Sequence, residues 1–159
     1  MGTEMAAFVL VHGAWHGGWC WKRVAPFLRR EGAEVYTPTL TGMGERAHLV
    51  GHLDPKAINL DLHARDVRQL LEYEDLTRVV LVGHAYAGMV ITAVAEACPE
   101  RIGQLVYLNG VVPNNGESMV DQLEAVRGPE FASWVRRQIQ TGQGFLPPPA
   151  TPQEVGRRW

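Results

Sequence analysis

The sequence lacks the features that mark membrane proteins, nucleic-acid-binding proteins and disulfide-rich proteins. No apolar run approaches the ~20 residues that a membrane-spanning helix requires, and no basic segment precedes a long apolar core at the N-terminus. The 15 basic and 17 acidic residues form no basic stripe, so nucleic acid is not an expected partner. Two cysteines, Cys20 and Cys98, are too few for a disulfide framework. We expect a cytoplasmic protein with Cys98 buried in an apolar helix.

The sequence contains instead a series of short apolar runs. They are nearly continuous rather than alternating, which is typical of strands covered on both faces in a parallel sheet. With 46% hydrophobic and 20% charged residues, the chain has the composition of one globular domain. The predicted strands are residues 7–12, 34–38, 78–83 and 104–108.

Segments of helical period lie between and after these runs. The alternation of strand and helix predicts an α/β fold with a doubly wound, mostly parallel sheet. In the first helix we expect a buried stripe of Trp21, Val24, Phe27 and Leu28. After Pro113 the pattern becomes purely helical, and the Gly/Pro-rich residues 142–152 are expected to be extended and exposed. The predicted helices are residues 19–30, 60–74, 86–97, 119–126 and 130–139.

The passage from the third strand into its helix has almost no loop. Such a sharp turn forces its central residue, Ala85, into a strained backbone conformation, which very small neighbours permit. Gly83, Ala87 and Gly88 are those neighbours. In the G-x-S-x-G turn of α/β-hydrolases this central residue is a nucleophilic serine at a helix N-terminus. A tight turn with no catalytic history is the alternative.

A second motif follows the first strand, where His12-Gly13-Ala14-Trp15 opens a Gly-rich loop. Acyl transfer needs two backbone N–H donors aimed at the oxyanion that develops on the carbonyl. One donor should be Tyr86, the residue after the nucleophile position, and Ala14 in this loop is the natural second donor. Gly13 allows the backbone to turn that amide toward a cavity.

We expect structural roles for most of the histidines and tryptophans. His12 and His16, like His48 and His52, are four residues apart, but both pairs fall in loops without a third ligand, so no metal and no cofactor is expected. We expect His12 to brace its loop and His63 to be exposed on a surface helix. Core and pocket wall are the expected places of three tryptophans, Trp15, Trp19 and Trp21.

Residues 7–119, with FVLVHGAWHGGW and VVLVGHAYAGMV, resemble a bacterial esterase of the α/β-hydrolase superfamily. The group concerned includes plant methylesterases and hydroxynitrile lyases. The resemblance implies an incomplete α/β-hydrolase fold, with residues 1–118 as the N-terminal part of the core and residues 119–159 as the start of a helical lid.

Three departures from the family pattern bear on activity. Ala85 stands where the family has its serine, while the neighbouring residues match. This single change favours a deliberate Ser→Ala substitution, with natural drift as the alternative. The chain order Ser…Asp…His places the family's acid and histidine beyond Trp159. Asn109 ends the fourth strand where many relatives carry Asp, and an amide cannot balance an imidazolium charge.

The resemblance therefore implies the scaffold of a carboxylic ester or lactone hydrolase that is inactive as written. The expected partner is a small ester or similar apolar carbonyl compound, with Phe131, Trp134 and Phe145 of the lid forming an apolar pocket. A non-catalytic protein that binds a small ligand on the same fold is the alternative. A second fragment or chain completing the sheet is also expected, because an open strand edge would invite aggregation. The expected substrate contacts are His12, Gly13, Trp15, His84 and Trp134.

Overall fold

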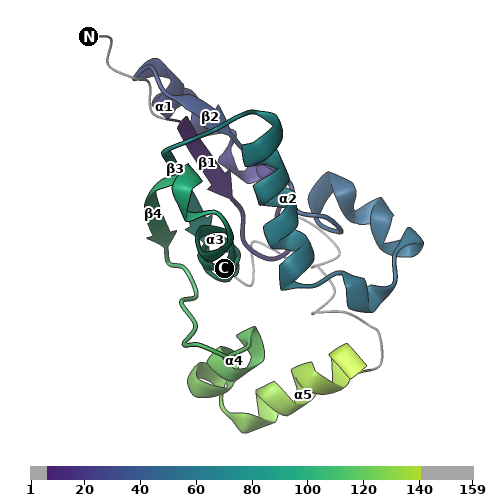
Figure 1. Cartoon of the computed structure of the whole chain (residues 1–159). Coiled ribbons are helices and arrows are strands. Elements are labelled where there is room, and N and C mark those ends of the chain that lie inside the picture. Colours follow the sequence, from purple (N-terminus) through teal and green to yellow (C-terminus); the bar gives the residue numbers. More distant parts are fainter. Residues whose placement is uncertain (1–6, 141–159) are drawn as a thin grey trace. The chain divides into compact units, whose positions relative to one another are not determined.

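The computed structural model describes residues 7–140 of the chain. The chain divides into two compact units, with the boundary between Asn114 and Asn115. The first unit contains the sheet and the second a pair of helices (Figure 1). Within residues 7–140, no helix is both long enough and apolar enough to cross a membrane.

Four parallel strands make the sheet of the first unit, and all four were predicted to within a few residues. Their order in space is β2-β1-β3-β4, so that β1 lies between β2 and β3 (Figure 1). Since each strand pairs in parallel with its neighbours, the carboxyl ends of the strands lie at one edge of the sheet. The strands are β1 (Ala7–Val11), β2 (Glu34–Tyr36), β3 (Val79–His84) and β4 (Ile102–Leu108).

The two faces of the sheet bury different side chains of the same strand. Val9 and Val11 of β1 are fully buried with α2 (Leu60–Tyr73) and α3 (Ala87–Ala97). Leu10 points to the other face, where it packs with Trp21. Because both faces are covered along β1, the strand is apolar throughout, as the sequence predicted. Cys98 at the end of α3 is 7% exposed, which confirms its predicted burial.

The predicted helix over residues 19–30 is wrong as a single element. The structure has a 3₁₀ turn, η1 (Gly18–Trp21), followed by a separate short helix, α1 (Ala25–Arg30). Pro26 explains the break, because proline lacks an N–H and disfavours helical backbone in the residue before it, so it belongs in a first helical turn. The predicted buried stripe is therefore partly wrong: Phe27 is 64% exposed, and the buried position is Ala25.

Three further 3₁₀ segments have no counterpart in the sequence prediction. The longest, η2 (Gly44–His52), carries Glu45 and Arg46 and precedes η3 (Pro55–Ala57) on the way to α2. The last, η4 (Pro99–Arg101), links α3 to β4.

The second unit is a helical hairpin of α4 (Met119–Arg127) and α5 (Pro129–Gln140), close to the two predicted helices. Ser118 and Asp121 form a reciprocal capping box that begins α4. Gly128, with φ of 84°, makes the turn between the helices. Residues 142–152, predicted to be extended, and Phe145, predicted to line a pocket, lie outside the described residues.

Candidate active site

Ala85 occupies the bend between β3 and α3 in the strained conformation that the sequence predicts. Its φ of 51° lies in the left-handed region, which an alanine rarely adopts. The bend is fixed by its own carbonyl, which accepts hydrogen bonds from the amides of Gly88 (3.0 Å) and Val111 (2.9 Å). Its amide donates to the carbonyl of Leu108 at the end of β4 (3.3 Å). The side chain of residue 85 is half-buried, so it is accessible from solvent.

The bend requires small residues on both sides. A Cβ atom at Gly83 would lie 2.6 Å from the carbonyl oxygen of Ala87, and one at Gly88 would lie 2.4 Å from the carbonyl oxygen of Val111. Both contacts are closer than a Cβ atom tolerates, and both partners are backbone atoms that cannot rotate away. The glycines therefore permit the sharp turn, as predicted.

The loop after β1 reaches the bend after β3. This follows from the register of the sheet, in which Val11 pairs with Gly83. A Cβ atom at Gly13 would lie 3.1 Å from the Cβ of Ala85. The next residues turn sharply: the amide of His16 donates to the carbonyl of Gly13 (3.4 Å), and Trp15 has a φ of 64°. Gly13 thus brings the first loop into contact with residue 85.

The two amides that the sequence singles out have no acceptor in the described structure. Within residues 7–140, no group accepts a hydrogen bond from the backbone N–H of Ala14 or from that of Tyr86. Both residues are half-buried. Unsatisfied backbone N–H groups are rare in folded proteins, so these two amides are candidate donors to a carbonyl oxygen or an anion.

His12 braces the first loop from within the core, as predicted. Its ring is fully buried, and Nδ1 lies 2.7 Å from the carbonyl oxygen of Gly13, which can only accept, so Nδ1 carries the proton. Nε2 then accepts a hydrogen bond from the amide of Leu40 (3.1 Å). Burial lowers the pKa of His12 to about 4, which keeps the ring neutral at pH 7. With both nitrogens occupied, the His12 ring has no free nitrogen with which to contact a ligand, and the predicted substrate contact of His12 stays a prediction.

His63 was expected to be exposed, and that expectation is wrong. Its side chain in α2 is 3% exposed and faces Thr41 and Tyr86 rather than solvent. Nε2 lies 3.0 Å from the carbonyl oxygen of Thr41, and Nδ1 lies 2.9 Å from the hydroxyl of Tyr86. Burial lowers the pKa of His63, against the opposing effect of the Thr41 carbonyl. The sequence carried no signal for this burial, because both partners are far from His63 along the chain.

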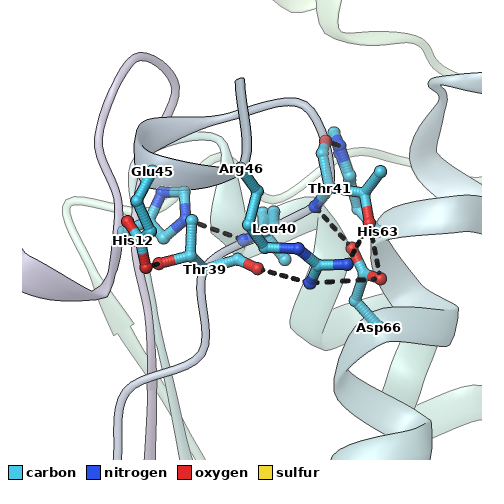
Figure 2. Close-up of polar contacts among 8 residues, drawn as sticks. All are labelled: His12, Thr39, Leu40, Thr41, Glu45, Arg46, His63 and Asp66. Carbon is cyan, nitrogen blue, oxygen red and sulfur yellow. Dashed lines mark hydrogen bonds and ion pairs between the residues drawn. The ribbon is translucent and has the colours of Figure 1, made fainter. Parts of the chain in front are cut away.

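Residues 39–41 form the segment between these two histidines (Figure 2). Asp66 of α2 accepts hydrogen bonds from the amide of Thr41 (2.6 Å) and from its hydroxyl (2.9 Å). Arg46 donates to the carbonyl of Thr39 (2.9 Å) and to the hydroxyl of Thr41 (2.9 Å), and its guanidinium lies 3.8 Å from Asp66. Charged and neutral hydrogen bonds together fix this segment beside the first loop.

The rings of His16, Trp21 and His84 form an aromatic group next to the bend, since His84 directly precedes Ala85. The rings of His84 and Trp21 meet edge to face with centroids 6.5 Å apart, and His84 meets His16 in the same way at 6.2 Å. Burial and the neighbouring His16 lower the pKa of His84. Trp21 is buried in the core, and Trp19 is 53% exposed and lines a cavity, so the two residues occupy the predicted places in the core and in a pocket wall. Trp15 is half-buried.

Not every predicted contact gathers at the bend. Trp134 lies in the second unit, where it packs with Val120, Ala132 and Val135, and its contact with a substrate stays a prediction.

In the described part of the chain, no three His, Cys, Asp or Glu side chains are grouped as metal ligands would be. A cavity of about 300 Å³ adjoins η1 and α1, and Ala85 is not among the residues that line it. The residues of that cavity are Gly18, Trp19, Lys22, Ala25, Arg29, Thr37 and Glu45.

Comparison with known proteins identifies the family of the chain. Residues 8–159 match the alpha/beta hydrolase family. The chain is 50% identical over 129 residues to a carbendazim hydrolyzing esterase of Nocardioides sp. (strain SG-4G), covering 81% of this chain and 52% of that protein. It is 32% identical over 124 residues to putative methylesterase 15, chloroplastic, of Arabidopsis thaliana, covering 76% of this chain and 26% of that protein.

A solved structure gives the same result for the fold. An extracellular alpha/beta-hydrolase from a Paenibacillus species, described as sharing structural and functional homology with tobacco salicylic acid binding protein 2, superposes with a TM-score of 0.73 at 28% identity. The match covers 89% of this chain and 55% of that chain. The chain thus spans about half the length, or less, of these relatives.

Proposed function

Because the chain belongs to the alpha/beta hydrolase family, we propose that it is the scaffold of a serine-hydrolase-type carboxylic ester or lactone hydrolase. In this proposal position 85 is the nucleophile position, and the amides of Ala14 and Tyr86 are the oxyanion-hole donors. With alanine at 85, the chain as written has no nucleophile there and is inactive. The 50% identical relative, named as an esterase, supports the same reaction class.

One observation carries the proposal: residue 85 has a left-handed φ of 51° and touches the loop that contains an amide without an acceptor. A serine at this place would present its Oγ at the N-terminus of α3. Attack of Oγ on the ester carbonyl would form the acyl-enzyme and release the alcohol, and water would then release the acid and restore the serine. The negative oxygen of each tetrahedral intermediate would accept hydrogen bonds from the two free amides.

The proposal needs a base for the serine proton, and neither buried histidine can serve. His12 and His63 each use both ring nitrogens on other partners. In the family pattern the acid and the histidine follow the nucleophile in chain order, so we propose that the base and its acid lie outside these 159 residues. A small apolar carbonyl compound remains the proposed ligand, with Trp15, His84 and Trp134 as its proposed contacts.

Completion of the sheet by a further segment or a second chain is part of the same proposal. Among the described strands β4 lies at one end of the sheet, with Leu108 50% exposed. Among residues 7–140, the helical segments that pack on the Trp21 face are η1 and α1, and Val106 of β4 is half-buried there. An additional strand beside β4 and a helix over this face would remove that apolar surface from water.

The test is Ala85→Ser in the full-length gene product, assayed with p-nitrophenyl acetate and with carbendazim. We expect hydrolysis above background, with a burst of p-nitrophenol of up to one equivalent of enzyme if deacylation is slower than acylation. Ala47→Ser, at an exposed position of η2, is the matched control and should leave the rate at background. If Ala85→Ser shows neither turnover nor burst above that control, the proposed function is wrong.

A non-catalytic ligand-binding protein is the second candidate, and the alanine at position 85 is the observation that favours it. The gene distinguishes the two functions at once, since a natural alanine codon at position 85 supports binding without chemistry. In that case the chain should bind an unreactive ester with equal affinity whether residue 85 is alanine or serine, and Ala85→Ser should release no product.

A further inference from the structure

The His63 ring connects two parts of the site that are far apart in the sequence. Its Nε2 lies 3.0 Å from the carbonyl oxygen of Thr41. A carbonyl oxygen can only accept, so Nε2 carries the proton of the neutral ring. Nδ1 is then a lone-pair acceptor, and the hydroxyl of Tyr86, 2.9 Å away, donates to it. The two rings also meet edge to face, with centroids 5.7 Å apart.

Tyr86 is held at both ends by this arrangement. Its backbone is the N-cap of α3, directly after the strained Ala85, and its amide is one of the two without an acceptor in residues 7–140. Its hydroxyl is hydrogen-bonded to a ring that is itself buried. Burial raises the pKa of Tyr86, so the hydroxyl keeps its proton and remains a donor at all ordinary pH values.

The same histidine is linked to the other free amide through residues 40 and 41. Thr41, whose carbonyl accepts from His63, follows Leu40, whose amide donates to His12 (3.1 Å). His12 in turn donates to the carbonyl of Gly13 (2.7 Å), the residue before Ala14. A continuous path of hydrogen bonds and one short backbone segment thus joins the Tyr86 side chain to the peptide that carries the Ala14 amide.

The segment does not depend on His63 for its own position. Asp66 lies one turn further along α2 and accepts two hydrogen bonds from Thr41, at 2.6 and 2.9 Å. Arg46 adds a third attachment through the Thr41 hydroxyl (2.9 Å). Removing the His63 ring would therefore leave residues 39–41 anchored to α2 while Tyr86 loses its only described side-chain hydrogen bond. This difference separates a role in positioning from a role in stability.

We propose that His63 is a positioning residue that fixes the Tyr86 amide relative to the Ala14 amide, so that both point at one oxygen atom. The proposal rests on the function proposed above, since it assigns those amides to the oxyanion hole. His63 touches no reacting atom and acts only through Tyr86 and Thr41.

Two substitutions test the two hydrogen bonds of the His63 ring separately. In His63→Asn the amide oxygen lies near the place of Nδ1 and can accept from the Tyr86 hydroxyl, while the Thr41 contact is lost. In His63→Gln the amide nitrogen reaches the place of Nε2 and can donate to Thr41, while the Tyr86 contact is lost. The exposed His48→Gln is the matched control.

The kinetic experiment uses the full-length gene product with Ala85→Ser and p-nitrophenyl acetate. We expect His63→Gln to lower kcat about tenfold or more with KM changed less than about twofold, because a misdirected oxyanion donor weakens only transition-state binding. His63→Asn should restore kcat to within about threefold of the parent. Tyr86→Phe should lower kcat as His63→Gln does, and the double variant should lose nothing further. Equal losses in His63→Asn and His63→Gln, or additive losses in the double variant, would overturn the proposal.

A spectroscopic experiment on the full-length gene product separates this proposal from the proposed function. We expect His63→Gln to shift the ¹H–¹⁵N resonance of the Tyr86 amide, because the hydrogen bond to the Tyr86 hydroxyl is lost, and His63→Asn to leave that resonance close to its position in the parent. His48→Gln should not move it. If Ala85→Ser is inactive but the shift in His63→Gln is present, the proposed esterase function is wrong and the positioning role of His63 stands. An unmoved Tyr86 resonance in a folded His63→Gln would overturn the positioning role, whatever the activity.

Discussion

Gly88→Ala is a substitution at which two physical effects oppose each other with known magnitudes. Gly88 is the second residue of α3, and alanine in a helix is more favourable than glycine by about 1 kcal/mol. The new Cβ would, however, lie 2.4 Å from the carbonyl oxygen and 2.7 Å from the amide nitrogen of Val111. Over-packing of this kind costs about 1–3 kcal/mol, and moving Val111 strains its 2.9 Å hydrogen bond to Ala85, which contributes about 1 kcal/mol.

The steric effect should therefore dominate, and Gly88→Ala should lower the free energy of unfolding by about 1–3 kcal/mol. The assay is urea unfolding of the 159-residue chain followed by tryptophan fluorescence. Gly51→Ala is the matched control, because a Cβ there would meet nothing within 4 Å and no left-handed φ is involved, and it should be neutral or slightly stabilising. A Gly88→Ala chain as stable as the parent would mean that the bend is not closely packed, and the argument for the elbow would fail.

Two further predictions concern stability. Folding lowers the pKa of His12 from 6.5 to about 4. Between these pH values the unfolded chain binds a proton that the folded chain does not, so the free energy of unfolding should be highest above pH 6.5 and fall by up to about 3 kcal/mol toward pH 4. Urea unfolding at pH 7 and pH 4.5 should show this slope, and His12→Asn should reduce it; an equal slope in both chains would refute the assignment. Arg101→Met should cost about 2 kcal/mol in thermal unfolding because it removes a charged donor from the carbonyls of Leu71 (3.2 Å) and Leu76 (2.8 Å). Asp75→Asn should change stability by less than about 0.5 kcal/mol, since this partner of Arg101 is 93% exposed, and the reverse ranking would contradict the interpretation.

The strands and the strained bend could be predicted because their signals are local. A continuous apolar run such as residues 79–82 predicts a buried strand without knowledge of the strands that it pairs with. The small residues around Ala85 indicate a sharp turn by themselves. The first helix was placed too early although Pro26 carried the necessary information, since proline fixes where a helix can begin. Its exposed Phe27 shows that helical spacing does not identify the buried face when the start of the helix is misplaced.

The polar part of the site could not be predicted, because its contacts cross the chain. His63 sits on a helix whose other polar residues are mostly exposed, and nothing near it in the sequence indicates Thr41 or Tyr86 as partners. His12 was correctly expected to brace its loop, but its bond to Leu40 depends on where the chain runs after β2. Hydrogen-bond partners of buried histidines are set by packing, which one sequence does not reveal.

The parallel pairing of Val11 with Gly83 has a consequence for the order of folding. No hairpin can bring these residues together, so two crossovers must form before the first loop can contact residue 85. During synthesis the loop at Gly13 therefore cannot reach residue 85 until α2 and β3 have emerged and packed together. A ligand that binds both the Ala14 and the Tyr86 amides would stabilise only a chain in which this slow, long-range contact has already formed.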